Sequence, residues 1–506
     1  MRRLHPVSPL FLSARLAYQM IYPLLGSFAW SSYQSYWLMY AILALIAAGA
    51  LWQYLFFRYA LEDEQLVVSQ GLIFRKHRKI PYTRIQNINT AQNPLHRLLG
   101  VATVQLESAS GGKPEAVLRV VDQPTIAQIR RKVLAAHADT AIDTKEPSLA
   151  ATQNTNQPVL HMSPGDVARY GLASQQGMLV FALAAGFFSQ NPHWHQYAGT
   201  KLAQLGWIPH WAAWSRTETM LMAIAAIVAL FLLLQVFTVA WALIRFYGFK
   251  LWAQTERLFA EMGLLPRVTA TIPRRRIQLY RIQENPIHRW LGGVTVTVET
   301  AGGVNTEQQG LVMRYLAPYI PHRRLVGFFA TIEPSIRWRR ISWRSLPLQT
   351  WQRVFKRWLA VWFMVLPAAG LLMWFAEKPV WPVALSLALV PPISWWYARA
   401  WVRHAGYEIN ASRFSVRHGV LFRKQVHVKL DKVQTISIHQ SPFDRRHDTG
   451  TLKVDTAGGN PMEPPVQMPY LPLNDAVRMR DFILRHIRHN PPLTTDSIRN
   501  GIQSRA

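Results

Sequence analysis

The sequence predicts an α+β membrane protein in which six transmembrane helices, arranged as three hairpin pairs, alternate with three small β-rich domains that each end in a helix. Three observations support this prediction. The hydrophobic residues, which make up 50% of the 506, are concentrated in paired runs. The basic residues gather on one side of these runs, and the hydrophilic segments between them repeat one another in register.

The first helix pair lies in residues 16–57, which contain no Asp, Glu, Lys or Arg. About 20 apolar residues cross a bilayer core, so this run holds two helices, separated by the polar residues 31–35. The predicted span 171–189 is polar at its start, where it contains Ser174, Gln175 and Gln176. A buried helix of a soluble domain is the alternative for this segment. The predicted spans are residues 16–33, 36–57, 171–189, 220–244, 358–375 and 380–396.

The distribution of charge predicts which side of the membrane the domains occupy. Each hairpin returns the chain to its starting side, and the loops inside the pairs carry only Lys201, Arg216 and Lys378 among the 56 basic residues. Because basic residues flank spans on the cytoplasmic side, we expect the N-terminus and all three domains in the cytoplasm. The net charge of +29 suits an anionic partner, either a membrane surface or nucleic acid, and because of the apolar runs we expect the phospholipid bilayer and no nucleic acid.

The three hydrophilic segments share motifs at fixed spacing. Each begins with a glycine-led arm, and nine residues after the glycine comes an alternating, strand-like run that ends in glutamine. An Asn-Pro or Ser-Pro turn follows, then a β-branched strand, a Gly-Gly pair and an amphipathic helical stretch. The unit is therefore a small sandwich or barrel capped by a helix. Its marker residues are Gly71, Gly263 and Gly419 in the arm, Gln86, Gln278 and Gln434 at the strand end, and Arg97, Arg289 and Arg445 in the turn.

These motifs resemble the bacterial pleckstrin-homology (PH) domain, and the alternation of helix pairs with three such domains resembles the YdbT-like membrane proteins over essentially the whole chain. The resemblance implies PH-like sandwiches closed by a C-terminal helix, a bacterial cytoplasmic (inner) membrane location, and a role in envelope maintenance or stress tolerance. It also implies a smaller membrane protein with a single PH-like domain as a partner. Pro266 and Asp444 depart from the repeated pattern, which leaves open whether the second and third copies bind what the first copy binds.

The expected domain organisation follows from the spans and the repeats. The Trp and Arg residues of 335–344 are typical of a membrane interface, with nucleic-acid stacking as the alternative. His193, His195 and His210 lie in an outer loop without a nearby carboxylate or cysteine, so we expect no metal site there. The predicted parts are a first helix pair with its N-terminal segment (1–57), PH-like domain 1 (58–136), a linker (137–166), a second pair (167–247) with outer loop 191–218, PH-like domain 2 (248–332), a basic juxtamembrane segment (333–357), a third pair (358–397), PH-like domain 3 (403–488) and a polar tail (489–506).

Basic residues of the arms and strands are the candidates for binding lipid phosphate. A Lys or Arg near an anionic leaflet contributes about 1 kcal/mol to membrane binding. The alternative is a solvated face whose charge serves topology and solubility. For the repeated glutamines and arginines we expect a structural role, because amides and guanidinium groups at turns satisfy loop carbonyls. The lipid candidates are Arg75, Lys76, Arg78, Lys79, Arg274, Arg275, Arg276, Arg423 and Lys424.

The sequence favours binding over catalysis. It contains no phosphate-binding glycine loop, no His-Glu-x-x-His helix and no Gly-x-Ser-x-Gly elbow, and it contains no cysteine. The spans carry only uncharged polar groups such as Gln19, Gln53 and Gln235, whereas a coupled transporter needs ionisable ones. We therefore expect a non-enzymatic binding or scaffold protein without a cofactor, whose domains engage anionic lipid headgroups or protein partners. Whether the chain forms a homo-oligomer is left open. The alternative function is a passive pore or transporter component formed by the six-helix membrane region.

Overall fold

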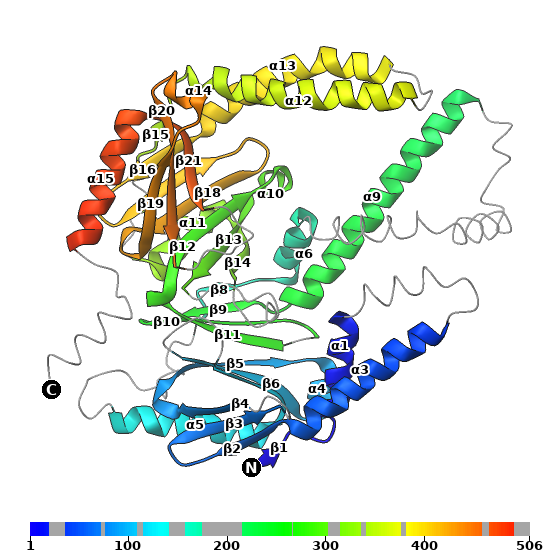
Figure 1. The fold of residues 1–506 in the computed structure, drawn as a ribbon, viewed down its shortest axis with the longest axis vertical. Coiled ribbons are helices and arrows are strands. Elements are labelled where there is room, and N and C mark those ends of the chain that lie inside the picture. The colour runs from blue at the N-terminus through cyan, green and yellow to red at the C-terminus, as the bar shows by residue number, and fades with distance from the viewer. Residues whose placement is uncertain are drawn as a thin grey trace. The chain divides into compact units, whose positions relative to one another are not determined.

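The computed structural model describes most of the chain and divides it into two compact units (Figure 1). The first unit ends at Thr271 and the second begins at Ile272. The described residues are 1–19, 36–71, 76–108, 115–140, 157–174, 215–265, 267–301, 314–334, 338, 341–375, 381–457 and 465–489.

The first unit contains two antiparallel sheets. Four strands form one sheet in the order β1 (Arg2–Arg3), β2 (Arg58–Leu61), β3 (Gln65–Gln70) and β4 (Lys76–Pro81). The other has seven strands in the order β7 (Ala116–Asp122), β6 (Val101–Ser108), β5 (Ile85–Gln92), β11 (Arg267–Pro273), β10 (Arg257–Met262), β9 (Lys250–Ala253) and β8 (Leu160–His161). In the first repeat, helix α5 (Gln123–Thr140) covers a core that includes Leu66, Tyr82, Ile85, Leu106, Leu118 and Ile129.

The second unit is built in the same way. A seven-stranded sheet runs in the order β14 (Tyr315–Pro321), β13 (Gly293–Thr300), β12 (Ile277–Glu284), β18 (Arg423–Lys429), β17 (Arg413–His418), β16 (Gly406–Ile409) and β15 (Arg344–Ser345). A three-stranded sheet follows, with β19 (Val433–His439), β20 (Thr449–Thr456) and β21 (Val466–Pro472). Helix α11 (His322–Ile332) follows β14, and α15 (Leu473–His489) closes the third repeat over Phe414, Val428, Leu452 and Met468.

Consecutive repeats share a sheet. The last three strands of the first repeat join the first strands of the second where β5 pairs with β11, and β12 pairs with β18 in the same way. The expectation of three repeated β-rich domains that each end in a helix is confirmed. The edge-to-edge pairing between them was not predicted.

The repeated sequence motifs correspond to backbone features. The arm glycines Gly71, Gly263 and Gly419 adopt φ values of +91°, +108° and +100°. Only glycine takes this backbone readily, and a Cβ on Gly419 would overlap the Phe422 carbonyl oxygen. The glycine is therefore required by the turn between the paired strands of the arm.

The second motif is interrupted where one continuous strand was expected. A 3₁₀ turn divides it in every repeat, at Tyr82–Arg84 (η1), Arg274–Arg276 (η4) and Leu430–Lys432 (η7). The expectation of a single alternating strand is wrong because the chain must leave one sheet and enter the next here. In the first two copies Pro81 and Pro273, which have no N–H for a ladder, lie directly before the turn.

Six of the described helices form three pairs. Helix α1 (Ser8–Gln19) packs on α3 (Tyr36–Phe56), α6 (Pro164–Ala173) on α9 (Arg216–Phe246), and α12 (Thr350–Phe375) on α13 (Trp381–His404).

Among the described residues two helices, at Val228–Phe246 and Thr350–Phe375, are long and apolar enough to cross a membrane, so the expected six spans are not shown. Tyr40–Phe56 is a shorter apolar helix, and most of the predicted spans 16–33 and 171–189 lies outside the described residues. Helix α13 carries Pro391, Pro392 and a Trp-Trp-Tyr sequence, which lower its mean hydropathy.

Candidate anion site at the base of the first helix pair

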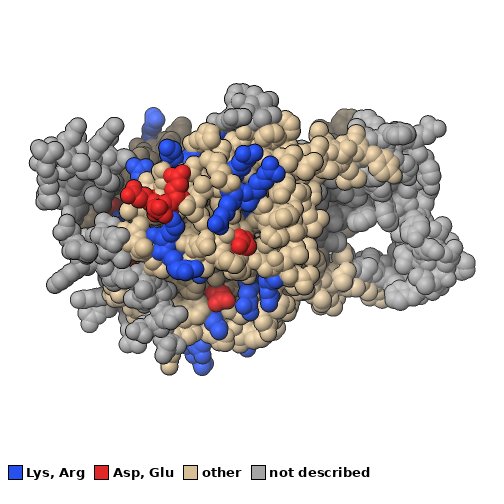
Figure 2. Space-filling model, turned by 90° about the horizontal axis from the view of Figure 1, so that it is seen from below, with Lys and Arg blue, Asp and Glu red and all other residues tan. Residues whose placement is uncertain are grey.

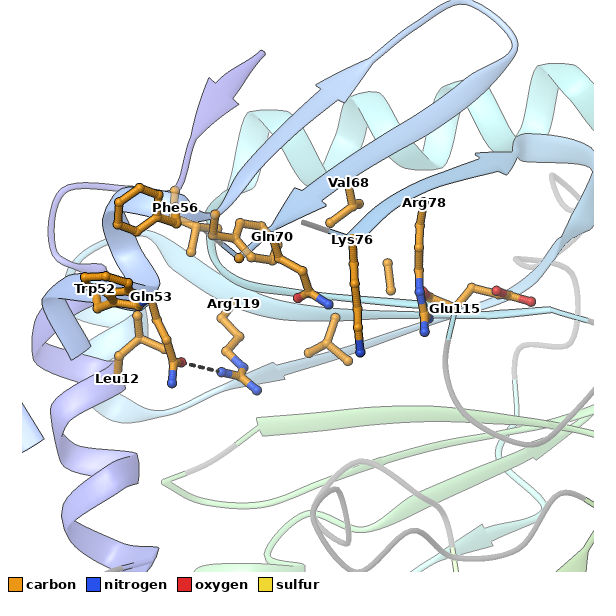
Figure 3. Close-up of a pocket in the computed structure, with 15 residues that line it drawn as sticks. Leu12, Trp52, Gln53, Phe56, Val68, Gln70, Lys76, Arg78, Glu115 and Arg119 are labelled. Carbon is orange, nitrogen blue, oxygen red and sulfur yellow. Dashed lines mark hydrogen bonds between the residues drawn. The ribbon is translucent and has the colours of Figure 1, made fainter. Parts of the chain in front are cut away.

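A cavity of about 460 Å³ lies where the first helix pair meets the first repeat (Figure 3). One part of its lining is apolar and comes mainly from the helix pair, and another part is cationic and comes from the strands. The lining residues are Leu4, Leu12, Trp52, Gln53, Phe56, Phe57, Val68, Gln70, Gly71, Lys76, Arg78, Glu115, Ala116, Val117 and Arg119.

Strand alternation places two of the cations side by side. In the β3–β4 pairing Lys76 lies opposite Gln70 and Arg78 lies opposite Val68, and all four side chains line the cavity. Residues two apart in a strand point to the same face of a sheet. Lys76 and Arg78 therefore extend together from β4 toward the cavity (Figure 3).

The last turn of α3 supplies the opposite part of the lining. Trp52 and Phe56 are one helical turn apart, with ring centroids 5.0 Å from each other. Gln53 lies on the same part of the helix, and its Oε1 accepts a hydrogen bond of 3.2 Å from Arg119 Nη1 (Figure 3). This bond joins the end of the apolar helix to strand β7.

The charge of the cavity is positive. Lys76, Arg78 and Arg119 contribute three cations, and Glu115 contributes the single carboxylate of the lining. Arg78 Nη1 donates to the backbone carbonyl of Glu115 at 3.0 Å, which fixes the guanidinium against β7. A site that combines fixed cations with an aromatic, apolar wall has the chemistry to hold a phosphate-bearing amphiphile.

Comparison with known families agrees with the repeat. The family model for the bacterial PH domain matches three times, at residues 14–137, 179–326 and 359–487. The chain belongs to the bacterial PH domain family. It is also 23% identical, over 436 residues and 83% of each chain, to the UPF0699 transmembrane protein YdbT of Bacillus subtilis. No solved structure matches it.

The other two PH domains lack this set of cations. The strand register aligns Lys76, Arg78 and Arg119 with Val268, Ala270 and Pro318 in the second domain. In the third domain the equivalent residues are Lys424, Val426 and Pro469. The combination is therefore specific to the first PH domain.

Several other predicted lipid ligands lie elsewhere. Lys79 points to the opposite face of β4, across from Val67, and Arg75 lies outside the described residues. On the face seen in Figure 2, Lys and Arg side chains are spread widely beside a smaller group of Asp and Glu. Lys79 itself is exposed and is not part of the cavity lining.

The basic residues of the second and third repeats mostly lie at turns and sheet junctions. Arg274, Arg275 and Arg276 form the η4 turn, where Arg274 Nη2 donates to the Thr331 carbonyl at 3.4 Å and Arg275 is exposed. Arg423 lies on β18 in the junction between repeats, 3.6 Å from a carboxylate oxygen of Glu284. Lys424 follows it on the same strand and is exposed.

The repeated arginines and glutamines differ in their contacts. Arg289 donates to the carbonyls of Val420 at 3.1 Å and Leu421 at 3.4 Å, so it holds the arm of the next repeat. Gln278 Nε2 donates to the Arg276 carbonyl at 3.1 Å. Gln434, Arg97 and Arg445 are exposed, and the side chain of Gln86 lies outside the described part.

Asp444 has the same local role as the histidine that it replaces. In the first turn the Asn93 N–H donates to His96 Nδ1 at 3.2 Å, and in the third the Ser441 N–H donates to Asp444 Oδ2 at 2.8 Å. Both side chains satisfy the N-cap of a short helix. The departure from the pattern therefore preserves the turn.

Two indoles of the Trp-rich segment before α12, Trp338 and Trp343, contact other protein side chains. The Trp338 ring stacks on Phe329 at 3.7 Å and lies 5.8 Å from the Arg413 guanidinium, and Arg417 lies 4.8 Å from the Trp343 ring. These contacts give the two indoles protein partners, and the membrane-interface position of this segment stays a prediction. The outer loop 191–218 with its histidines lies outside the described residues, apart from 215–218.

Proposed function

We propose that this chain is a non-enzymatic, multi-pass membrane protein whose first PH domain binds the phosphate headgroup of an anionic lipid. The observation that carries the proposal is the cavity itself, which joins Lys76, Arg78 and Arg119 to the end of an apolar helix. In this arrangement the headgroup lies between the three cations, and the first carbons of the acyl chains lie against Trp52 and Phe56.

Two observations support the membrane location in this proposal. The apolar side chains of α9 remain largely exposed, with Leu232, Leu233 and Val236 at 57%, 66% and 67%. An exposed apolar helix surface of this kind is satisfied by lipid. The Bacillus subtilis relative is named a transmembrane protein. We therefore extend the topology to six spans, with the N-terminus and the PH domains in the cytoplasm of a bacterial cell.

Lipid binding is tested with full-length protein in a neutral detergent, titrated with a fluorescent phosphatidylglycerol and separately with the matching phosphatidylcholine. Lys76→Ala/Arg78→Ala removes two cations, each contributing about 1 kcal/mol, so we expect phosphatidylglycerol affinity to fall about 30-fold. Lys79→Ala, on the other face of the same strand, serves as the matched control and should bind as the wild type. Equal affinity of the double variant and this control would refute the assignment.

The topology is tested by single-cysteine accessibility, which the cysteine-free sequence makes simple. In intact cells a membrane-impermeant maleimide should label a cysteine at Gln196, in the predicted outer loop, and leave one at Glu62 unlabelled. Both should react after permeabilisation. Labelling of Glu62→Cys in intact cells contradicts the cytoplasmic position of the first PH domain.

A further inference from the structure

The described strands form sheets of four, seven, seven and three strands along the chain. Each seven-stranded sheet combines the last three strands of one repeat with the four strands that open the next. Among the described strands, the first sheet, β1 to β4, is an opening half that pairs with no closing half, and the last sheet, β19 to β21, is a closing half that pairs with no opening half. Together the two terminal halves have the seven strands of one junction.

Both internal junctions use the same register. Gln92 lies opposite Arg267 where β5 meets β11, and Glu284 lies opposite Arg423 where β12 meets β18. These positions are equivalent in the repeat, because Gln92 and Glu284 each lie six residues after the marker glutamine of their copy. The junction is therefore a defined, repeated interface.

Side chains reinforce the first of these junctions. The Thr90 and Thr269 hydroxyls are 2.8 Å apart, and the Thr271 N–H donates to Asn89 Oδ1 at 3.2 Å. Asn89 is only 2% exposed in this paired state. Pairing thus buries polar side chains that find partners across the two strands.

The equivalent edge of the third repeat is open. Within the described residues β19 pairs only with β20, and Thr435, Ser437 and His439 along it are exposed. Strand β4 likewise pairs only with β3. The sequence of β19 contains no Lys, Arg, Asp or Glu, the charged residues that commonly protect an edge strand from pairing.

We propose that β19 binds strand β4 of a second copy of this chain, so that copies associate head to tail through a third junction of the same kind. The internal register places Ser437 opposite Arg78, Ile436 opposite Lys79 and His439 opposite Lys76 of the second copy. The resulting order, β21-β20-β19 followed by β4-β3-β2-β1, reproduces both internal sheets, including the two-residue outer strand. The pairing is a strand addition between two different edges, β19 of one copy and β4 of the next. Because each copy carries both edges, the association can continue beyond a dimer.

A second copy fits this edge for two reasons. It supplies the same four-stranded half that β19 lacks, and its Lys76 is equivalent to Lys424, which already lies in the junction between β12 and β18. The pairing uses backbone groups of β4, while the Lys76 and Arg78 side chains point to one face. The pairing therefore does not require bound lipid, and Arg78, which it places opposite Ser437, is also one of the proposed lipid ligands.

Disulfide crosslinking in membranes tests the proposal, with two differently tagged single-cysteine proteins, Ser437→Cys and Arg78→Cys. Directly opposed residues in antiparallel strands have Cα atoms about 4.5–5.5 Å apart, within the range of a disulfide. We expect a mixed dimer when the two proteins are co-expressed and oxidised, and none from either alone. His77→Cys, one residue out of register, replaces Arg78→Cys as the control and should crosslink at least tenfold less.

Three results would overturn the proposal. A dimer formed by Ser437→Cys alone would mean that two β19 strands lie against each other. Equal crosslinking of His77→Cys would indicate random collision without a fixed register, and the absence of a mixed dimer would exclude the pairing.

Charge variants give a second measurement on uncrosslinked protein. Ser437→Lys, opposite Arg78, should weaken association up to about fivefold and Ser437→Glu should strengthen it similarly. The same effect from both substitutions contradicts the register.

Discussion

The buried His288 makes the second PH domain sensitive to acid. Its ring is 5% exposed, Nε2 lies 3.1 Å from the Thr295 hydroxyl, and burial, with a smaller contribution from the charge of His322, lowers its pKa to about 4. An unfolded histidine titrates near 6.5. Between these values the unfolded state binds more protons than the folded state, so stability is present above pH 6.5 and falls as the pH approaches 4.

The size of this effect follows from the two pKa values. Between pH 7.5 and 4.5 the difference in proton binding by His288 lowers the free energy of unfolding by about 2–3 kcal/mol. His288→Gln keeps a polar side chain and removes the titration, so its loss of stability over this range should be about 2–3 kcal/mol smaller than that of the wild type. Hydrogen exchange of the β13 amides, corrected for the intrinsic pH dependence of exchange, measures the local opening free energy.

A second variant separates protonation from the loss of a hydrogen bond. Thr295→Val removes the partner hydroxyl but leaves the histidine, so it should lower the stability of β13 at both pH values and keep the pH dependence. If His288→Gln and the wild type lose the same free energy between pH 7.5 and 4.5, the reasoning from burial is wrong.

Two further predictions concern contacts between segments. Arg289→Ala removes two hydrogen bonds to the arm at 419–424 and should speed its hydrogen exchange about tenfold, whereas Arg445→Ala, at the exposed equivalent position, should not. Gly171→Ala places a Cβ 2.6 Å from the Val239 Cα and should separate α6 from α9, lowering the thermal midpoint by at least a few degrees. Gly165→Ala, whose Cβ meets nothing closer than 3.7 Å, is the control, and equal midpoints for the two glycine variants would contradict the close packing.

Local features of the fold could be predicted from the sequence, because they depend on residues near one another in the chain. Gly419 needs its positive φ whatever surrounds it, and Ser441 with Pro442 starts a short helix through its own hydrogen bonds. The sharing of sheets could not be predicted in this way. Strand β5 pairs with β11, which lies about 180 residues later, and nothing in the sequence of either strand identifies its neighbour.

The candidate site was also predicted in part. Lys76 and Arg78 stand out as basic residues beside a helix pair, but Arg119 lies on a strand of ordinary alternating sequence. Its contribution depends on where β7 lies relative to Gln53, and that is decided by the packing of the domain against the helices. Lys79 is a cation on the same strand as Lys76 and Arg78, but its side chain points to the opposite face and therefore lies outside the site.

The shared sheets decide where this chain can be divided. A fragment that ends after α5 cuts the β5–β11 junction and leaves an uncovered edge prone to aggregation. A cut at the 3₁₀ turn Arg274–Arg276, inside the second repeat, leaves both seven-stranded sheets whole. The sheets of this protein, and not its sequence repeats, are therefore the units to keep intact when it is truncated.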